Sequence, residues 1–182
     1  WKGKRERAAI IERTSRGKWA KAKSGKWVGT GFAPFGYRTE GKQESARLAI
    51  CEAEARVVRQ IFADYTRGDD THGPLSLRAI AIELEARSEP TPNHRRNAAG
   101  HWIPATLRGI LTNEIYAGRT YYGKTRVVRT SGGKKRRVKQ PPESQIPLDV
   151  PELAIVDRPT FEAALARAER NKELSPRNRQ HE

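Results

Sequence analysis

The sequence predicts an α+β fold that is mainly helical, with a helix-turn-helix-like unit, a small antiparallel sheet or hairpin and an N-terminal connecting helix. Apolar residues recur at helical spacing over 52–67, 77–84 and 161–168. A short helical pattern over 104–112 completes the helix-turn-helix-like unit, because it follows two amphipathic helices and a loop. Residues 115–129 are instead rich in Tyr and Val and lead into a glycine turn, which favours a hairpin.

The first 24 residues are expected to begin as a helix, whose few apolar side chains in its first part are Ala8, Ile10 and Ile11. A helix with so little amphipathic character is mostly solvated or bound to nucleic acid. The glycine-rich segment 25–36 is expected to be a loop anchored by aromatic residues. Two short strands, over 37–38 and 48–50, then flank a polar turn.

Two amphipathic helices are expected next. The first runs from 52 to 67 and ends at Gly68, with an apolar stripe made by Ala53, Val57, Val58, Ile61, Phe62 and Tyr65. Ser76 is expected to cap the second helix, whose apolar face consists of Leu77, Ile80, Ala81 and Leu84. The loop that follows, over 88–100, is basic at Arg95 and Arg96.

The short helix over 104–112 has a stop signal at each end. Pro104 is tolerated at a first helical position because its missing N–H has no intrahelical partner there, and Asn113 is expected to close the helix in the left-handed conformation. One face consists of Leu107, Ile110 and Leu111, and the residues that point elsewhere are Thr106, Arg108, Gly109 and Thr112. Because a two-turn helix is not stable alone in water, it must dock on a core. Its small, cationic outer face fits a DNA major groove.

Strand material over 115–129 is expected to continue through a turn at 130–134 into a returning basic strand over 135–139. Pro141 and Pro142 end this hairpin. Asp157 and Pro159 begin a last helix, whose apolar face consists of Phe161, Ala164, Leu165 and Ala168. The tail after residue 174 is polar and expected to be disordered.

Charge is concentrated in two segments of the chain. The 182 residues carry 36 Lys and Arg against 21 Asp and Glu, a formal net charge of +15. Residues 1–50 hold 13 basic and 4 acidic side chains and residues 119–145 hold 9 and 1, whereas 51–118 and 146–182 each have a net charge of −1. Two basic segments that bracket a near-neutral body are typical of arms that grip a polyanion. A merely solvated basic surface is the plainer alternative.

Residues that could support a catalytic or metal site are sparse. One cysteine, Cys51, excludes an internal disulfide and a cysteine-based zinc site. The four histidines lack metal-ligand spacing, and no carboxylate pair stands out. No apolar run reaches the ~18 residues that a membrane helix needs, and no signal peptide is visible. We therefore expect no cofactor, no metal and a cytoplasmic protein, and the start at Trp1 rather than Met indicates a piece of something longer.

The candidate DNA contacts are the basic and small polar residues of the expected arms, loop and docked helix: Arg13, Arg16, Lys18, Lys21, Lys23, Arg38, Arg95, Arg96, Thr106, Arg108, Thr112, Lys134, Lys135, Arg136 and Arg137. Arg108 leads them because an arginine on a reading helix favours guanine, although it could also be an ordinary surface arginine. The N-terminal cations either cross the DNA backbone or minor groove or are simply solvated. The run K-K-R-R is either a hairpin tip on phosphates or an unbound basic turn, and Trp102 is interpreted as a core residue rather than a stacking platform.

Short motifs are spread over most of the chain: E-R-x-x-I-x-E-R-T over 6–14, G-F-A-P-F-G-Y-R over 31–38, E-A and V-V-R-Q-I-F-A-D-Y within 54–65, S-x-x-x-I-A-x-x-L over 76–84, T-P at 91–92 with Trp102 and I-L-T-N-E-I-Y-A-G over 110–118, and A-I-V-D with F-E within 154–162. In this order they resemble the recombinase domain of large serine recombinases, the phage integrases and transposases of the resolvase/invertase superfamily. Phe35 stands where that family usually has Tyr. Each motif alone is weak, but six in order are specific.

The resemblance implies a division of the chain. Residues 1–25 would be the end of a connecting helix from a missing catalytic domain, 26–171 the DNA-binding recombinase domain, and 172–182 a disordered tail or the start of a linker. Family members cut both DNA strands with an N-terminal serine nucleophile and then rotate and religate. None of the eight serines here has the Y-x-R-x-S-type context of that nucleophile, and the cysteines of the usual zinc ribbon are absent.

The fragment is therefore expected to bind an attachment site in double-stranded DNA without cutting it, and to meet other recombinase subunits through the missing domains. The alternative is a basic protein that binds RNA or DNA through charge, without sequence preference. A standalone enzyme is disfavoured because no catalytic site is visible.

Overall fold

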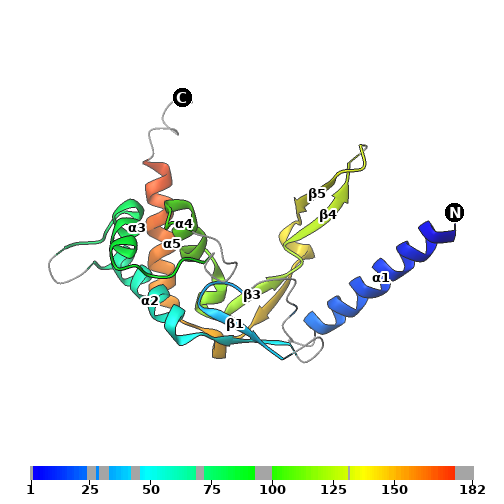
Figure 1. The fold of residues 1–182 in the computed structure, drawn as a ribbon, viewed down its shortest axis with the longest axis horizontal. Helices are drawn as coiled ribbons and strands as arrows, with labels where there is room; N and C mark the ends of the chain where they lie inside the picture. Colours follow the sequence, from blue (N-terminus) through cyan, green and yellow to red (C-terminus); the bar gives the residue numbers. More distant parts are fainter. Residues whose placement is uncertain are drawn as a thin grey trace.

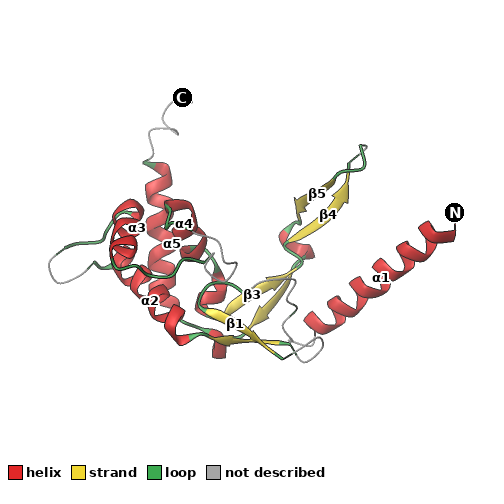
Figure 2. Ribbon diagram, viewed as in Figure 1, coloured by secondary structure: helices red, strands yellow, loops and turns green. Residues whose placement is uncertain are grey.

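The computed structural model describes residues 2–23, 28, 33–41, 46–68, 72–92, 100–130 and 132–174. Four helices gather in what we call the helical body: α2 (Glu52–Thr66), α3 (Leu77–Ala86), α4 (Pro104–Leu111) and α5 (Arg158–Glu173). Two elements extend away from it: helix α1 (Lys2–Lys23) and the hairpin arm, formed by β4 (Thr125–Arg129) and β5 (Lys135–Lys139) (Figure 1). Helices combined with antiparallel strand pairs confirm the predicted α+β fold (Figure 2).

Helix α2 lies at the centre of the helical body because one of its sides is apolar throughout. The residues of that side that are at most 1 % exposed are Ala55, Val57, Val58, Ile61 and Phe62. Helices α3, α4 and α5 all contact α2, and the Phe62 ring lies 6.0 Å from the Phe161 ring of α5. The predicted stripe is thus confirmed except at Ala53, which is exposed because it lies in the first turn, ahead of the packed side.

Helix ends follow the predicted caps at two positions. The Ser76 hydroxyl accepts a hydrogen bond from the Ala79 N–H at 3.1 Å, and the Asp157 carboxylate accepts one from the Thr160 N–H at 3.1 Å. Hydrogen bonds from Thr160 hold the pKa of Asp157 below its ordinary value. Each cap satisfies an N–H that the first helical turn cannot pair internally.

Two buried tyrosines tie the segment before α2 to the segment after α4. The Tyr37 hydroxyl lies 3.0 Å from the Ile115 carbonyl oxygen and 2.7 Å from that of Leu153. The Tyr116 hydroxyl donates to the Phe35 carbonyl oxygen at 2.8 Å. Burial raises the pKa of both hydroxyls above the ordinary tyrosine value. The motifs over 31–38 and 110–118 therefore have a packing role.

Gly36 makes the close turn that brings the chain onto α2. Its φ is +89°, and a Cβ there would lie 2.9 Å from the Ile155 Cδ1 atom. A side chain would therefore be strained and would clash. The Gly36 N–H donates to the buried Glu54 carboxylate at 2.7 Å, which fixes the turn against the start of α2.

The strands form three antiparallel pairs. Strand β1 (Tyr37–Glu40) pairs with β2 (Arg47–Ile50), β3 (Arg119–Tyr122) with β6 (Ile146–Asp149), and β4 with β5. The first and last of these pairs confirm the predicted strands over 37–38 and 48–50 and the predicted basic hairpin. Strand β6 was not predicted: Pro141 and Pro142 were expected to end the hairpin, and no further strand was expected after them. Pro147 lies within β6, where proline is tolerated because the strand is an edge strand.

Two expectations around residue 115 are wrong. The chain over Glu114–Ala117 forms a 3-10 turn rather than a strand, because Ile115 and Tyr116 are buried in the core. Asn113 is not left-handed: its φ is −92° and ψ 108°, and its side chain accepts from the Ile115 N–H to begin that turn. The left-handed position comes later, at Gly118, with a φ of +76°.

Candidate nucleic-acid interface

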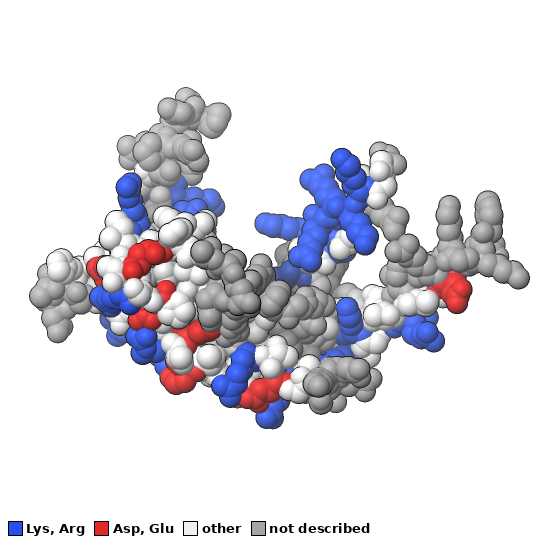
Figure 3. Space-filling view, in the orientation of Figure 1, with Lys and Arg blue, Asp and Glu red and all other residues white. Residues whose placement is uncertain are grey.

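Basic side chains gather on the hairpin arm, whereas the acidic side chains in this view lie mainly over the helical body (Figure 3). The exposed cations of the arm and its immediate approach are Lys124, Arg126, Lys134, Lys135, Arg136, Arg137 and Lys139. Within the described part of the chain, no acidic side chain forms an ion pair with any of them. The arm thus presents concentrated positive charge that no described carboxylate offsets.

The strand register divides these cations between two faces. Val127 pairs with Arg137 and Thr125 with Lys139, so both cations share a face with Lys135, two residues further along β5. We call the set Lys135, Arg137 and Lys139 the triple-cation face. Every residue of β5 is exposed, and Val127, on the same face, is 58 % exposed. The face therefore packs on no described element and is available to a ligand.

The opposite face of the hairpin carries fewer cations. Arg126 pairs with Val138 and Arg136 with Val128, so two arginines and two valines lie together there. The predicted run K-K-R-R is consequently not one surface: Lys134 lies in the turn, Lys135 and Arg137 on one face and Arg136 on the other. Lys124, Arg126 and Lys139 were absent from the predicted set, although the period-two spacing of a strand would have included Lys139.

The predicted cations of α1 do not form one stripe. Arg13 and Arg16 are exposed, and Lys18 and Lys21 are half-buried. At 3.6 residues per turn these four positions spread over about 200° of the helix circumference, too wide for one straight duplex to contact together. The Arg16 guanidinium also lies 3.7 Å from the Glu12 carboxylate. The side chain of Lys23 lies outside what the structure describes.

Helix α4 docks as its apolar face predicted. Leu107 and Leu111 are at most 1 % exposed and Ile110 is 5 % exposed. Arg108 is exposed on the outer side, and no described residue gives its guanidinium a hydrogen bond or ion pair. Beside it, a Cβ built on Gly109 would have no atom within 4 Å apart from its chain neighbours and the backbone of its own helix. The outer side is thus small and cationic.

The two threonines of α4 differ in what they offer. Thr106 is half-buried. Thr112 is exposed, but its hydroxyl donates to the Arg108 carbonyl oxygen at 2.8 Å. Its hydroxyl hydrogen is therefore already used in a hydrogen bond to a carbonyl in the last turn of α4. Thr112 is the weaker reading candidate for that reason.

The remaining predicted contacts are Arg38 on β1 and the pair Arg95 and Arg96. Arg38 is exposed on β1, but its guanidinium lies 2.9 Å from the Glu40 carboxylate, which also pairs with Arg47 at 3.1 Å. Hydrogen bonds from Arg38 and then Arg47 hold the pKa of Glu40 below its ordinary value. The charge of Arg38 is therefore offset locally. Arg95 and Arg96 lie outside the described residues.

Trp102 is a core residue, as predicted. It is 4 % exposed, its ring lies 5.5 Å from that of Phe35, and its indole N–H donates to the Glu89 carbonyl oxygen at 3.1 Å. The segment before α4 is thereby held to the segment that follows α3. Trp102 places the docked helix and is not itself available to a ligand.

Other classes of site were sought within the described ranges. They contain no group of three or more His, Cys, Asp or Glu residues arranged to hold a metal ion. Among the helices described, none combines the length and apolar character needed to cross a membrane. Cys51 is half-buried and unpaired with another cysteine.

The chain is similar in sequence to known proteins. The sequence model of the Recombinase family matches residues 52–171, well over half of the chain. A protein of Bacillus subtilis (strain 168) named "Putative DNA recombinase" is 30 % identical over 177 residues, which cover 93 % of this chain and 33 % of that protein. The chain therefore spans about a third of the length of that curated relative.

A solved structure described as "Crystal Structure of a LSR-DNA Complex" has a similar fold. The match covers 93 % of this chain and 41 % of the solved chain, with a TM-score of 0.50 and 18 % sequence identity. At that identity the likeness concerns the fold alone.

Proposed function

This chain belongs to the Recombinase family, and we propose that it binds double-stranded DNA as the attachment-site-recognising domain of a site-specific serine recombinase. The family match agrees with the motif resemblance seen in the sequence. The hairpin arm and those α1 cations that lie on one side of that helix would bind phosphates, and α4 would read base edges.

The observation that carries the proposal is the triple-cation face. Its three side chains stand two residues apart on β5, all exposed. A two-stranded hairpin that packs nothing on its faces is only marginally stable by itself, so a bound partner accounts for its composition better than folding does. Neutralising phosphates with Lys and Arg releases counterions and supplies affinity without sequence preference.

Sequence preference is proposed to come from α4. A docked helix with buried Leu107 and Leu111 is held rigidly, and its exposed Arg108 is free of described ion pairs. Arginine donates two parallel hydrogen bonds to guanine in the major groove, which is the commonest specific contact of this kind. Contacts to phosphates position such a helix, and contacts to bases specify the site.

A second candidate function is favoured by the hairpin alone. Binding of RNA or DNA through charge, without sequence preference, would use the triple-cation face equally well and would leave Arg108 without a special role. The two functions differ in whether one duplex is preferred at equal ionic strength.

The reaction itself is proposed to belong to parts of the parent outside this chain. Serine recombination needs a nucleophilic serine, and none of the eight serines here has the motif that carries it in the family. The chain also spans only a third of its curated relative. We accordingly propose that catalysis and the contacts with other recombinase subunits lie elsewhere in a cytoplasmic parent protein.

The proposal is tested by selection followed by titration. The chain would select from a pool of randomised duplexes, and the enriched duplex and a scrambled duplex of equal composition would be titrated by fluorescence anisotropy at several salt concentrations. Site recognition predicts an enriched sequence that binds at least about tenfold more tightly than its scrambled form. No enrichment and equal affinities with a steep salt slope would contradict it and support charge-only binding.

A further inference from the structure

The strand pair β3–β6 and the hairpin arm form one two-stranded ribbon with a bend between them, and helix α1 packs beside that bend (Figure 1). We propose that Trp19 is a positioning residue that fixes the angle between α1 and the hairpin arm, and so holds the hairpin arm and the cations on one side of α1 in position for one duplex. The functional half of this inference rests on the proposed function, in which both elements bind DNA. The structural half concerns the protein alone.

The bend comes from unequal numbers of residues on the two sides of one ribbon. Strand β3 continues into β4 after Gly123 and Lys124, whereas β5 continues into β6 only after residues 140–145. Extra residues on one strand bend an antiparallel ribbon. The Gln140 N–H still donates to the Lys124 carbonyl oxygen at 2.9 Å, so pairing extends up to the bend. Gly123 has a φ of +87°, a conformation that other residues rarely adopt.

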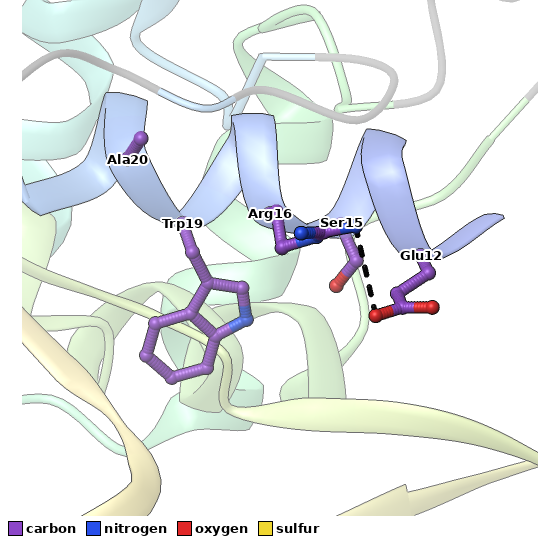
Figure 4. Close-up of a pocket in the computed structure, with 5 residues that line it drawn as sticks. All are labelled: Glu12, Ser15, Arg16, Trp19 and Ala20. Carbon is purple, nitrogen blue, oxygen red and sulfur yellow. Dashed lines mark ion pairs between the residues drawn. The ribbon is translucent and has the colours of Figure 1, made fainter. Parts of the chain in front are cut away.

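The indole of Trp19 packs against this bend. Its ring lies 5.7 Å from the Tyr122 ring at an interplanar angle of 89°, the edge-to-face geometry that aromatic pairs favour. A Cβ built on Gly123 would lie 3.8 Å from the Trp19 Cζ2 atom. The close-up shows the indole projecting from α1 toward the strands (Figure 4). Trp19 thus contacts the residues at which the hairpin arm takes its direction.

Among the α1 side chains that the structure describes, the packed ones lie in the last turns of the helix. Ala22 is fully buried, and α1 contacts β6. The Tyr122 hydroxyl of β3, whose ring Trp19 contacts, is partly buried, and this burial raises its pKa. Residues 12–17 are instead exposed. The side toward the strands opens into a hollow of about 510 Å³ lined by Glu12, Ser15, Arg16, Trp19 and Ala20 (Figure 4). The orientation of α1 relative to the hairpin arm therefore depends on the contacts near Trp19.

A fixed angle has a consequence for binding. Two surfaces held in the correct relative position bind one ligand without the loss of freedom that two independent arms would suffer. Loosening the contact should weaken binding to every duplex by roughly fivefold, because both arms still reach DNA but must be ordered first. The number of phosphates contacted, and hence the salt slope, should stay the same.

The test measures the angle directly in the DNA-free protein. Spin labels are placed at Ile10→Cys and Val127→Cys, positions that are 48 % and 58 % exposed, in a Cys51→Ala background, and the distance distribution is measured by pulsed electron paramagnetic resonance. We expect a narrow distribution in the otherwise unchanged protein and in Trp19→Phe, which keeps an aromatic edge, and a broad one in Trp19→Ala.

A second labelled pair shows whether the helical body survives. Ile82→Cys and Leu174→Cys, 62 % and 64 % exposed, should keep one distance in every variant. A broad Ile10–Val127 distribution without any change at Trp19, or an equally narrow one in Trp19→Ala, would overturn the proposal.

Trp19→Ala and Trp19→Phe are then titrated with duplex DNA in the otherwise unchanged, unlabelled protein. A roughly fivefold loss of affinity in Trp19→Ala at an unchanged salt slope supports presetting of the two arms. Unchanged affinity despite broadened distances would overturn the presetting role. If the unchanged protein bound no duplex at all, the proposed function would fail, and the distance measurement would still decide whether Trp19 fixes the angle.

Discussion

The helical body and the hairpin arm treat their charged residues in opposite ways. In the body, several exposed arginines pair with carboxylates, among them Arg56 with Glu89 at 2.9 Å and Arg87 with Glu83 at 3.1 Å. On the arm, the triple-cation face has no such partner among the described residues. Folding therefore accounts for the composition of the body, whereas the composition of the arm requires a polyanionic partner.

The same contrast applies to apolar residues. Val58 of α2 is fully buried, whereas Val127 of β4 is 58 % exposed. Arg108 lies within the body yet resembles the arm, since it is exposed without a described partner. Residues that contribute little to stability are thus the ones to examine for function, in both regions.

The largest expected effect on DNA affinity comes from removing the charges of the triple-cation face. Replacing Lys135, Arg137 and Lys139 together by Gln should lower affinity for any duplex about 100-fold near physiological salt and flatten the salt slope by about 2.7, because three phosphate contacts are lost. Anisotropy titrations at several salt concentrations measure both quantities.

The matched control lies on the other face of the same hairpin. Arg126→Gln with Arg136→Gln should lose less affinity per charge removed. An equal loss per charge on both faces would show that the arm acts as a diffuse cation rather than through one face.

The next largest expected effect comes from Arg108, on the outer side of α4 in the helical body. Arg108→Ala should lower affinity for the preferred duplex by about 1–3 kcal/mol and leave scrambled DNA unaffected, because a base-edge contact is lost. Arg56→Ala, which removes an ion-paired arginine of α2, should change neither. If Arg108→Ala weakened binding to all duplexes equally, Arg108 would be a phosphate contact.

One substitution made in each region compares their stabilities. Val58→Ala should lower the free energy of unfolding by about 2 kcal/mol, from lost burial and a residual cavity. Val127→Ala should change it by less than about 0.5 kcal/mol, as is usual at an exposed position. Urea unfolding followed by circular dichroism measures both, and similar losses would mean that the arm has a packed side in solution.

High pH should weaken the body through its two buried tyrosines. The pKa values of Tyr37 and Tyr116 are raised in the folded protein by burial, so above pH 10 the unfolded chain loses protons that the folded chain retains. Each tyrosine then lowers stability by about 1.4 kcal/mol per pH unit above 10. Urea unfolding at pH 9, 10 and 11 tests this, and Tyr37→Phe should show a shallower decline. Constant stability over that range would argue against buried hydroxyls.

The sequence predicted the elements whose signals are local. The apolar spacing of α2 and the caps at Ser76 and Asp157 depend on residues within a few positions of one another, and the structure confirms them. The turn at Ile115 was missed because a short apolar run is compatible with a strand, and only packing of Tyr116 against distant rings decides otherwise.

The candidate site was predicted by residue type more than by arrangement. Which hairpin cations share a face depends on strand register, and a contiguous run such as K-K-R-R does not reveal it. The contact of Trp19 with Tyr122 joins residues about a hundred positions apart, and no local sequence pattern indicates it. The local ion pair of Arg38 could have been suspected from Glu40, two residues along the same strand.

The central claim is that the hairpin arm is a DNA-binding surface and the interior of the helical body is not, and amide hydrogen exchange with and without saturating duplex tests it most directly. The account predicts fast exchange over 125–139 in the free protein, since the ribbon is only two strands wide. DNA should slow exchange over that segment, while the amides of α2, already protected by the core, should not change. Unchanged exchange over 125–139 at saturating duplex would contradict the account.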